Sequence, residues 1–405
     1  MTAARDHGSA SGAEGWAVWF WTDFLPDWLA QVQDAEGGVF DALDHAGRPA
    51  ATADKTLLTQ SRTLFILSHL ALLSGDPTLT AAAQRQAAFL PRFRKAPGLY
   101  CRAVHRDGSP TGLVADDVSR SYDHSFVLLA LATWGRLAPS ADTQAEIEAC
   151  WATLCTTLTD PATGLLLEDD GIADPAGPGA PPRAQNPHMH LYEACLQAHE
   201  MSGEARWLER AAGLRALALR HFLDAETGSI AEFLAPDLRP LPGTAGLRRE
   251  PGHQCEWAWL LWREADLGGD PALRSVAARL ARFADTHGFA PAGPLQGAAY
   301  DAVAASGGVM EESFLLWPQT EAIKAFAVRH TAGDATAGGR ARALLCLMFE
   351  SWFAGRPAFV NRLDKNGVSL WSEALTRLLY HLALALTEGA RAGLWPGIPR
   401  PQKTQ

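Results

Sequence analysis

One stretch of the chain, residues 184–197 (AQNPHMHLYEACLQ), holds many side chains that titrate or form hydrogen bonds. Its apolar residues have the spacing of an amphipathic helix. The first turn of that helix carries Asn186, His188, His190 and Glu193. Imidazole transfers protons near neutral pH better than other side chains. The stretch therefore predicts a catalytic or ligand-binding site at the start of a helix.

Comparable polar groups recur at a nearly constant interval. From Arg62 to His124 is 62 residues, from His124 to His190 is 66, and from His190 to His253 is 63. A single histidine on an apolar helix is usually a core residue with satisfied hydrogen bonds, but coincidence explains a whole series poorly. The other polar residues near the starts of such helices are Gln60, Tyr122, Asp123, Glu256, Glu311, Glu312, Trp317, Gln319, Glu321, Trp371, Glu373 and His381.

Helical apolar periodicity dominates the chain. The predicted helices are 14–34, 56–74, 77–95, 119–136, 140–158, 187–201, 204–223, 251–267, 271–288, 310–329, 338–351 and 369–388. Every second one, starting with 56–74, is apolar on most of its surface, which indicates burial on most sides. The buried helices are expected to begin near residues 56, 119, 187, 251, 310 and 369, with gaps of 63, 68, 64, 59 and 59.

A constant period indicates one repeated supersecondary unit. Six pairs of helices can close into a ring, so we expect an all-α (α/α)6 barrel of six inner and six outer helices. Short segments that begin near a glycine precede most buried helices and predict β-hairpins or loops at the mouth. An open solenoid is the alternative, but it needs polar capping repeats. We expect a single barrel domain over 14–390, with a disordered tail at 1–13 and a C-terminal tail at 391–405.

The inner helices of such a barrel run in the same direction, because one outer helix separates each from the next. Their N-termini then gather at one mouth, which is the expected pocket. The net charge of −10 and the lack of a basic block argue against a nucleic-acid partner. The N-terminal residues lack the apolar core of a signal peptide, and no stretch reaches the ~20 apolar residues of a membrane span. The six cysteines form no CxxC pair, so we expect free thiols and a cytoplasmic protein.

The residue types leave several chemistries open. His190 with Glu193, and His253 with Glu256, are three apart and share a helix face, so they could ligate a metal. The chain has no histidines at i and i+4 in such a motif and no cysteine pair, which favours a glutamate that orients a neutral histidine. There is no GxSxG elbow. Carboxylates such as Asp123 keep a glycosidase mechanism open.

The abundance of histidine favours proton transfer beside a sugar carbonyl. A base removes the proton on C2 of an open-chain aldose and leaves a cis-enediol or enediolate. Return of the proton to C1 gives a ketose, and return to C2 from the opposite face gives the 2-epimer. Arg62 could stabilise negative charge on the enediolate oxygens, and Trp317 or Trp371 could pack against a sugar face.

Several motifs together resemble one family. In chain order they are TQSR, YDHSFVLLALA, NPHMHLYEA, EPGHQCEWAWLLWR, WPQTEAIKA and YHLALAL. They resemble the N-acylglucosamine 2-epimerase (AGE) superfamily of (α/α)6 barrels over nearly the whole chain. The PGHQ-x-EWAWLL and WPQTE motifs are most similar to its D-mannose isomerase branch, and less similar to its N-acetylglucosamine and cellobiose 2-epimerases.

This resemblance implies acid–base catalysis by His253 and His381 without a metal or other cofactor. The residues that it implies around the sugar are Arg62, Tyr122, Asn186, His190, Glu256, Trp317 and Glu321. His188 is interpreted as structural beside His190, and His124 stays unassigned. The resemblance does not decide which histidine acts on carbon.

The implied function is an aldose–ketose isomerase that interconverts D-mannose and D-fructose, with D-lyxose and D-xylulose as a second candidate pair. The sequence shows no Lys/Arg cluster suited to a phosphate, which favours a free monosaccharide as the substrate. A sugar 2-epimerase of the N-acylglucosamine or cellobiose type, a glycoside hydrolase on the same barrel and a sugar-binding protein without activity remain alternatives. Either a monomer or a homodimer is compatible with the sequence.

Overall fold

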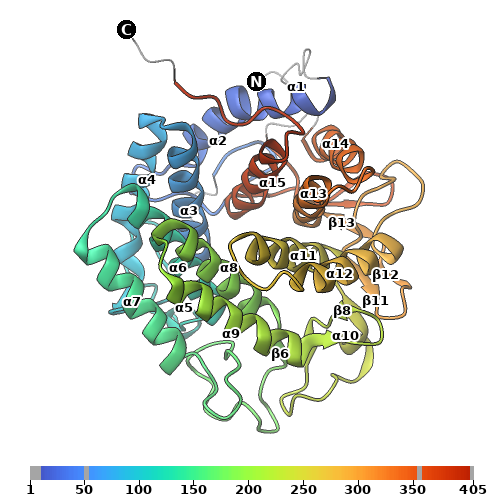
Figure 1. The fold of residues 1–405 in the computed structure, drawn as a ribbon. Helices are drawn as coiled ribbons and strands as arrows, with labels where there is room; N and C mark the ends of the chain where they lie inside the picture. Colours follow the sequence, from blue (N-terminus) through green and yellow to red (C-terminus); the bar gives the residue numbers. More distant parts are fainter. Residues whose placement is uncertain (1–10, 50–53, 354–357, 402–405) are drawn as a thin grey trace.

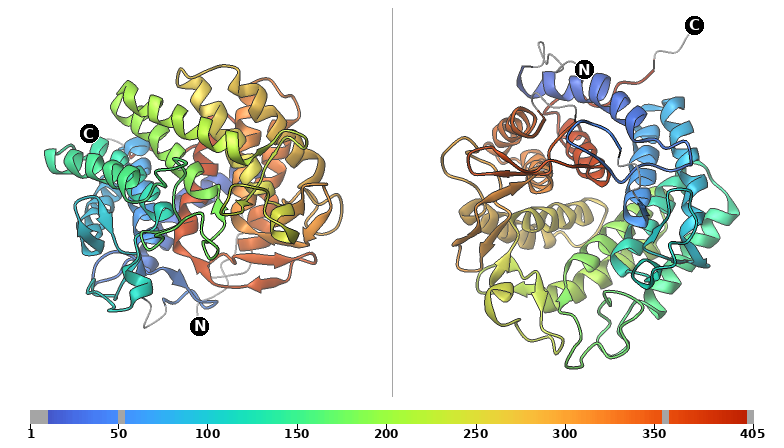
Figure 2. Two further views of the ribbon diagram at one scale, coloured as in Figure 1. Left: turned by 90° about the horizontal axis from the view of Figure 1, so that it is seen from below. Right: turned by 180° about the vertical axis from the view of Figure 1, so that it is seen from behind.

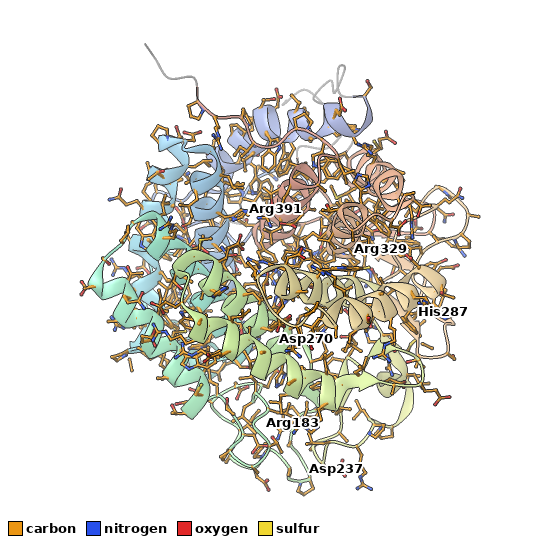
Figure 3. All side chains as sticks on the ribbon, in the orientation of Figure 1. Arg183, Asp237, Asp270, His287, Arg329 and Arg391 are labelled. Atoms are coloured by element: carbon orange, nitrogen blue, oxygen red, sulfur yellow. The ribbon has the colours of Figure 1, made fainter. Side chains whose placement is uncertain are left out.

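The computed structural model describes residues 11–49, 54–353 and 358–401, and within them the chain is mainly helical. Six of the described helices are largely buried and contact one another in sequence, and the last contacts the first, so the contacts form a closed ring (Figure 1). Figure 3 shows side chains filling the space between these helices. The inner helices are α3 (Leu57–Ser74), α6 (Ser121–Leu137), α8 (Asn186–Ser202), α11 (Pro251–Asp266), α13 (Leu316–Thr331) and α15 (Leu379–Arg391).

The remaining long helices pack outside this ring, and most contact the inner helix that precedes them. Their bounds are α1 (Gly12–Trp19), which continues through a π-helical turn (Phe20–Phe24) into α2 (Leu25–Val32), α4 (Pro77–Phe89), α7 (Ala141–Thr156), α9 (Ala205–Phe222), α12 (Leu273–His287) and α14 (Ala337–Met348). In α9 only one face is buried, through Trp207, Ala211, Ala218 and Phe222. The predicted helical class is confirmed, and the arrangement is consistent with an α/α toroid.

Two predicted helix starts are wrong. Residues 309–311 and 313–315 form strands β12 (Val309–Glu311) and β13 (Ser313–Leu315), so that α13 begins at Leu316. Residues 369–371 and 374–375 form β15 (Ser369–Trp371) and β16 (Ala374–Leu375), and a 3-10 turn (Thr376–Leu378) leads into α15. Short apolar runs do not distinguish strand from helix by periodicity. With the observed starts, successive inner helices begin 64, 65, 65, 65 and 63 residues apart, which is more regular than the predicted spacing.

Short antiparallel strands connect the helices, as the glycine-led segments predict. The left view of Figure 2 shows strands from the N-terminal and C-terminal parts of the chain at the same end of the helices. Pairs form between β1 (Ala42–Leu43) and β16, β2 (Lys55–Thr56) and β5 (Ala103–Val104), β3 (Arg94–Ala96) and β4 (Leu99–Tyr100), β6 (Arg183–Ala184) and β9 (Phe233–Leu234), and β7 (Leu223–Asp224) and β8 (Ser229–Ile230). The larger sheets are β10 (Arg248–Arg249)–β11 (Ala302–Ala304)–β12 and β13–β14 (Arg362–Asp364)–β15.

The repeat has a structural signature at the third or fourth residue of five inner helices. There, a buried glutamine or histidine side chain accepts the backbone N–H of a residue in the preceding connection, at 2.7–3.1 Å. These side chains are Gln60, His124, His188, Gln254 and Gln319, and their partners are Val39, Tyr100, Leu166, Ile230 and Ala299. The glutamines also donate to the carbonyl of the same partner. These bonds fix the connections to the helix starts, because a buried backbone N–H needs an acceptor.

The structure describes parts of the two segments that were predicted as tails, 1–13 and 391–405. Helix α1 begins at Gly12, and residues 1–10 and 402–405 lie outside the described residues. Trp395 is buried and donates its indole N–H to the carbonyl of Leu386 at 2.9 Å, so the chain stays packed beyond residue 390. The division into one domain over 14–390 with two tails stays a prediction. Within the described residues, the helices are all too short or too polar to cross a membrane.

Candidate active site

A cavity of about 680 Å³ lies at the N-terminal ends of the inner helices. Its lining includes eight of the nine residues predicted for the site, which are Arg62, Tyr122, Asn186, His190, His253, Glu256, Trp317 and His381. Most of them lie in the first turn of a helix; His381, for example, is the third residue of α15. The ninth residue, Glu321, lies behind His381 and contacts it. The structure therefore brings the predicted residues together.

His381 is held between a carboxylate and a guanidinium. Its Nδ1 lies 2.7 Å from Glu321 Oε1, and its Nε2 lies 3.2 Å from Nη1 of Arg62. A carboxylate at Nδ1 selects the tautomer with a proton there, so Nε2 carries the lone pair and accepts from Arg62. Burial, followed by the positive charges of Arg62 and Lys324, lowers the pKa of His381 well below 6.5. His381 is therefore a neutral imidazole with a lone pair at the cavity.

A buried lysine, Lys324, forms an ion pair with Glu321. Lys324 Nζ contacts Glu321 Oε2 at 2.5 Å and lies 3.8 Å from the centre of the Trp259 ring. Burial opposes the charge on Lys324, but Glu321 and Glu256 outweigh it and raise the pKa of Lys324. Burial raises the pKa of Glu321, and the charge of Lys324 offsets part of this increase. Sequence analysis missed Lys324, since one lysine in an apolar helix gives no signal of its surroundings.

His253 has the opposite environment. Its Nδ1 lies 2.7 Å from Glu232 Oε2 and 3.3 Å from Glu250 Oε2. Burial disfavours the imidazolium, but the charges of Glu232 and Glu250 outweigh burial and raise the pKa of His253 to about 10. Glu232 is itself fixed by Gln185 Nε2 at 3.0 Å and by the backbone N–H of Glu250 at 2.9 Å. His253 is therefore a protonated imidazole at neutral pH.

Sequence analysis also missed Glu232 and Glu250. Glu232 lies in the connection between β8 and β9, within the otherwise apolar run SIAEFLA, and Glu250 is the N-cap residue of α11. A glutamate within a short apolar run is the signal that could have pointed to Glu232, because a carboxylate is rarely buried without a partner.

The two histidines lie beside the same indole. The ring centre of Trp317 is 4.8 Å from that of His253 and 5.9 Å from that of His381. When the surroundings raise the pKa of one titratable group and lower that of its neighbour, the first can act as an acid and the second as a base. One indole flanked by a charged and a neutral imidazole can hold a sugar between a proton donor and a proton acceptor.

We expect the Glu232→Gln variant to change the pH dependence of activity. In the wild type, kcat/KM should fall as pH rises through about 10, when His253 loses its proton. Removal of the Glu232 charge destabilises the imidazolium, so this alkaline limb should move to lower pH by about one to three units. A pH profile of kcat/KM measures the shift. Glu226→Gln, on the exposed turn of the same connection, is the matched control; an alkaline limb that stays in place in Glu232→Gln would remove Glu232 from this role.

Other cavity residues present polar atoms suited to hydroxyl groups. Glu256 Oε1 and Asn186 Oδ1 are buried and have no hydrogen-bond partner among the described residues. Burial and the neighbouring Glu321 raise the pKa of Glu256 well above its usual value, which favours the protonated carboxyl. His190 Nδ1 lies 3.1 Å from Glu193, and burial is the main cause that lowers the pKa of His190 to about 4. These atoms can bind several hydroxyl groups of a polyol, which matches a sugar.

Some candidates from the sequence lie elsewhere. His124 and His188 fix the connections, with both ring nitrogens bonded to backbone groups, so they are structural. Glu311 pairs with Arg248 and Arg362 on the hairpins. The remaining candidates outside the cavity lining are Gln60, Asp123, Glu312, Gln319 and Glu373, whereas Trp371 lines it from β15.

Among the described residues, three groups of side chains bring potential metal ligands within 4.8 Å of one another. They are His190–Glu193–Glu256, Glu232–Glu250–His253 and Glu256–Glu321–His381. In the second, an imidazolium has no lone pair to offer, and in the other two Glu256 has a raised pKa. Metal ligands must be deprotonated, so a metal ion at any of these groups would have to displace a proton. The metal-free mechanism stays a prediction.

Comparison with known proteins identifies the family. The family model for N-acylglucosamine 2-epimerase (GlcNAc 2-epimerase) matches residues 38–385. The chain belongs to this family. A mannose-6-phosphate isomerase from Rhizobium meliloti (strain 1021) is 31% identical over 321 residues, which cover 78% of this chain and 79% of that protein. A D-mannose isomerase from Thermobifida fusca is 29% identical over 276 residues, or 64% of each chain.

Solved structures of the family share the fold. A D-mannose isomerase structure superposes with a TM-score of 0.77 at 20% identity, over 93% of this chain and 95% of that chain. A cellobiose 2-epimerase from Bacillus thermoamylovorans B4167 superposes with a TM-score of 0.78 at 16% identity, over 91% and 96%. Isomerases and epimerases are thus equally similar in fold, so the fold does not decide between the two activities.

Proposed function

We propose that this chain is a metal-free aldose–ketose isomerase with an (α/α)6 barrel, and that it interconverts D-mannose and D-fructose. One observation carries the proposal: a neutral His381 and a charged His253 flank Trp317 in one cavity. The names of the relatives at 31% and 29% identity support a mannose-type sugar. D-lyxose and D-xylulose differ from this pair at the C6 end and are the second candidate pair.

In the first half of the reaction, His381 acts as the base. Its Nε2 takes the proton from C2 of the open-chain aldose, and the electron pair of that bond forms the C1=C2 double bond. The electrons of the carbonyl move to O1, which receives a proton from the imidazolium of His253. The product is a cis-enediol, and His381 now carries the proton that came from C2.

In the second half, the same two groups act in reverse. His381 returns its proton to C1, and the hydroxyl on C2 becomes the carbonyl of the ketose by giving its proton back to His253. The two oxygens of a cis-enediol lie side by side, so one imidazole can serve both. Both histidines end in their starting states, and no other acid, base or redox partner is needed.

Arg62 assists the carbon–hydrogen cleavage. In the free protein its Nη1 donates to the lone pair of His381 Nε2, and its Nη2 donates to Tyr122 Oη at 2.8 Å. When the sugar takes the place of that first contact, the guanidinium is placed to donate to an oxygen that gains charge as the enediolate forms. Trp317 packs against the sugar, and Glu256 and Asn186 bind its hydroxyl groups.

A sugar 2-epimerase is the second candidate, because two imidazoles in one cavity could reach opposite faces of C2. The fold is as similar to a cellobiose 2-epimerase as to a D-mannose isomerase, so it supports both candidates equally. The opposite charge states of the two histidines favour the isomerase instead, because epimerisation needs a group on each face that can exchange a proton with carbon. A hydrolase has less support, since two of the buried carboxylates, Glu232 and Glu321, already bind the two histidines.

Incubation of D-mannose with the protein in deuterated water tests the proposal. We expect carbon and proton NMR spectra to show fructose with deuterium at C1. Glucose with deuterium at C2 and without fructose would establish the epimerase, and the lack of any new sugar would overturn both activities. A parallel sample with EDTA should react at the same rate, and inactivation there would contradict the metal-free mechanism.

A further inference from the structure

A buried lysine faces three buried carboxyl groups behind the cavity. Lys324 is fully buried on α13 and is not part of the cavity lining, so it cannot contact a sugar there. Its Nζ lies 2.5 Å from Glu321 Oε2 and 3.9 Å from Glu256 Oε1. The third carboxyl group, Glu193 on α8, also acts on its charge. Lys324 can therefore affect the reaction only through other side chains.

The three carboxyl groups differ in their partners. Glu193 accepts a tyrosine hydroxyl at 2.5–2.6 Å and lies 3.1 Å from a second imidazole. Glu256 Oε1 is without a hydrogen-bond partner among the described residues. Glu321 connects the lysine to His381, because its other oxygen, Oε1, lies 2.7 Å from His381 Nδ1. Lys324, Glu321 and His381 therefore form a chain of contacts that ends at the cavity.

The charge on Glu321 decides which ring nitrogen of His381 carries the proton. A carboxylate only accepts hydrogen bonds, so it requires the proton on Nδ1 and leaves the lone pair on Nε2, at the cavity. A protonated carboxyl group can donate to Nδ1 instead, and the imidazole proton then lies on Nε2, where a base is needed. Burial raises the pKa of Glu321 and favours the protonated carboxyl, whereas the charge of Lys324 favours the carboxylate.

The other groups around Glu321 do not supply this charge. Glu256 on α11 and Glu193 on α8 each oppose a further negative charge at Glu321. Burial lowers the pKa of His190, also on α8, to about 4, so this imidazole is neutral at neutral pH. Lys324 is therefore the cation that offsets burial and the two neighbouring carboxyl groups.

Arg62 favours the same form of His381 from the cavity side. Its Nη1 lies 3.2 Å from His381 Nε2 and donates to the lone pair there. In the proposed reaction the sugar takes the place of this contact, so Arg62 no longer opposes a proton on Nε2. In the occupied cavity, control over the imidazole proton then comes from the Glu321 side.

We propose that Lys324 is a positioning residue that acts through Glu321 and keeps the proton of the His381 imidazole on Nδ1, with the lone pair at the cavity. The proposal rests on the proposed function, because it concerns the base of that reaction. The ring of Trp259, whose centre lies 3.8 Å from Nζ, helps to hold the ammonium group in the interior. The charge of Lys324 is the property that matters, so an uncharged side chain of similar length should not replace it.

The variant Lys324→Met removes the charge and keeps a side chain of similar length. At neutral pH we expect kcat for D-mannose to fall at least about 10-fold, since one unit of pKa at Glu321 changes the ratio of carboxylate to carboxyl tenfold. KM should change little, because Lys324 does not line the cavity. The loss should diminish as pH rises and Glu321 ionises without the lysine, so the acidic limb of kcat/KM should move to higher pH by about one unit or more.

The matched control is Lys365→Met. Lys365 also forms an ion pair with a glutamate, Glu312, at 3.0 Å, but on an exposed hairpin. Its kcat and its pH profile should equal those of the wild type. Circular dichroism checks that each variant is folded. If the methionine variant does not fold, Lys324→Gln takes its place, because glutamine lacks the charge but keeps a polar group beside Glu321.

Nitrogen NMR of isotopically labelled histidine provides a readout that does not depend on turnover. The chemical shifts of the two ring nitrogens show which of them carries the proton, and the signals of His381 are those missing from His381→Asn. The wild type and Lys365→Met should show His381 protonated at Nδ1. Lys324→Met should show a measurable share of the form that is protonated at Nε2, and this share should decrease as pH rises.

The outcomes separate the positioning role from the proposed function. If Lys324→Met is folded and less active, but its acidic limb and the proton of His381 match the wild type, the lysine is only structural and the proposal is wrong. If the wild type forms fructose and Lys324→Met equals it in every readout, the positioning role is wrong and the isomerase stands. If the proton of His381 moves in Lys324→Met but the wild type converts no sugar, the proposed function fails and the control of His381 by Lys324 stands.

Discussion

Replacement of His381 by asparagine is expected to lower kcat for the aldose–ketose conversion by about 10³- to 10⁴-fold, the upper part of the range for loss of a general base. Asparagine can still donate to Glu321 near the position of Nδ1, but it has no basic nitrogen near C2. KM should change little, because Arg62, Trp317 and Glu256 still line the cavity. Steady-state assays with D-mannose, followed by fructose formation, measure both constants.

The matched control is His221→Asn, which removes a partly exposed imidazole from the outer helix α9. Its activity should equal that of the wild type. The thermal midpoint of His381→Asn should remain close to the wild-type value, since the buried Glu321–Lys324 pair is retained. A folded His381→Asn variant with kcat within a few-fold of the wild type would show that another group removes the proton.

The second large effect is expected for His253→Gln, which should lower kcat by about 10²- to 10³-fold. Glutamine can donate a hydrogen bond to O1 but cannot transfer a proton, so the enediolate charge is only partly neutralised. The loss should be smaller than for His381→Asn, because Arg62 can still stabilise the enediolate. The alkaline limb near pH 10 should also disappear from the kcat/KM profile, since that limb belongs to His253.

Exchange of the C2 hydrogen separates the two histidines. Proton NMR in deuterated water should show slow residual exchange at C2 of mannose with His253→Gln, and none above background with His381→Asn. Faster exchange in His381→Asn than in His253→Gln would reverse the two roles. If both folded variants lost exchange of the C2 hydrogen completely, both histidines would be needed to remove that proton, and a role of His253 at oxygen alone would be contradicted.

The sequence predicted much of the ring because its periodicity reflects the repeat. Burial of nearly the whole surface of helices such as α8 leaves an apolar pattern, and a repeat of about 65 residues placed His190 and His253 at equivalent helix starts. The same regularity was misleading for His124, whose position in the series reflects a bond to the backbone of Tyr100 rather than chemistry.

What could not be predicted depends on contacts between distant segments. The charge of His253 comes from Glu232 in a short connection, and the basicity of His381 is tuned by Arg62, which is 319 residues away. The position of Arg377 at the cavity also depends on contacts in space that its sequence neighbours do not show. A helical pattern also cannot reveal that residues 369–375 pair as strands, because their apolar residues suit either structure.

The fate of the hydrogen on C2 provides the most direct test of proton transfer between the two imidazoles. D-mannose carrying deuterium at C2 should react in ordinary water with a primary isotope effect on kcat, and part of the label should be lost to solvent while the rest appears at C1 of fructose. His381→Asn should neither form fructose nor release label. Complete retention of deuterium at C1 with no loss to solvent, together with sustained turnover in a folded His381→Asn variant, would contradict transfer by an imidazole and point to a hydride shift.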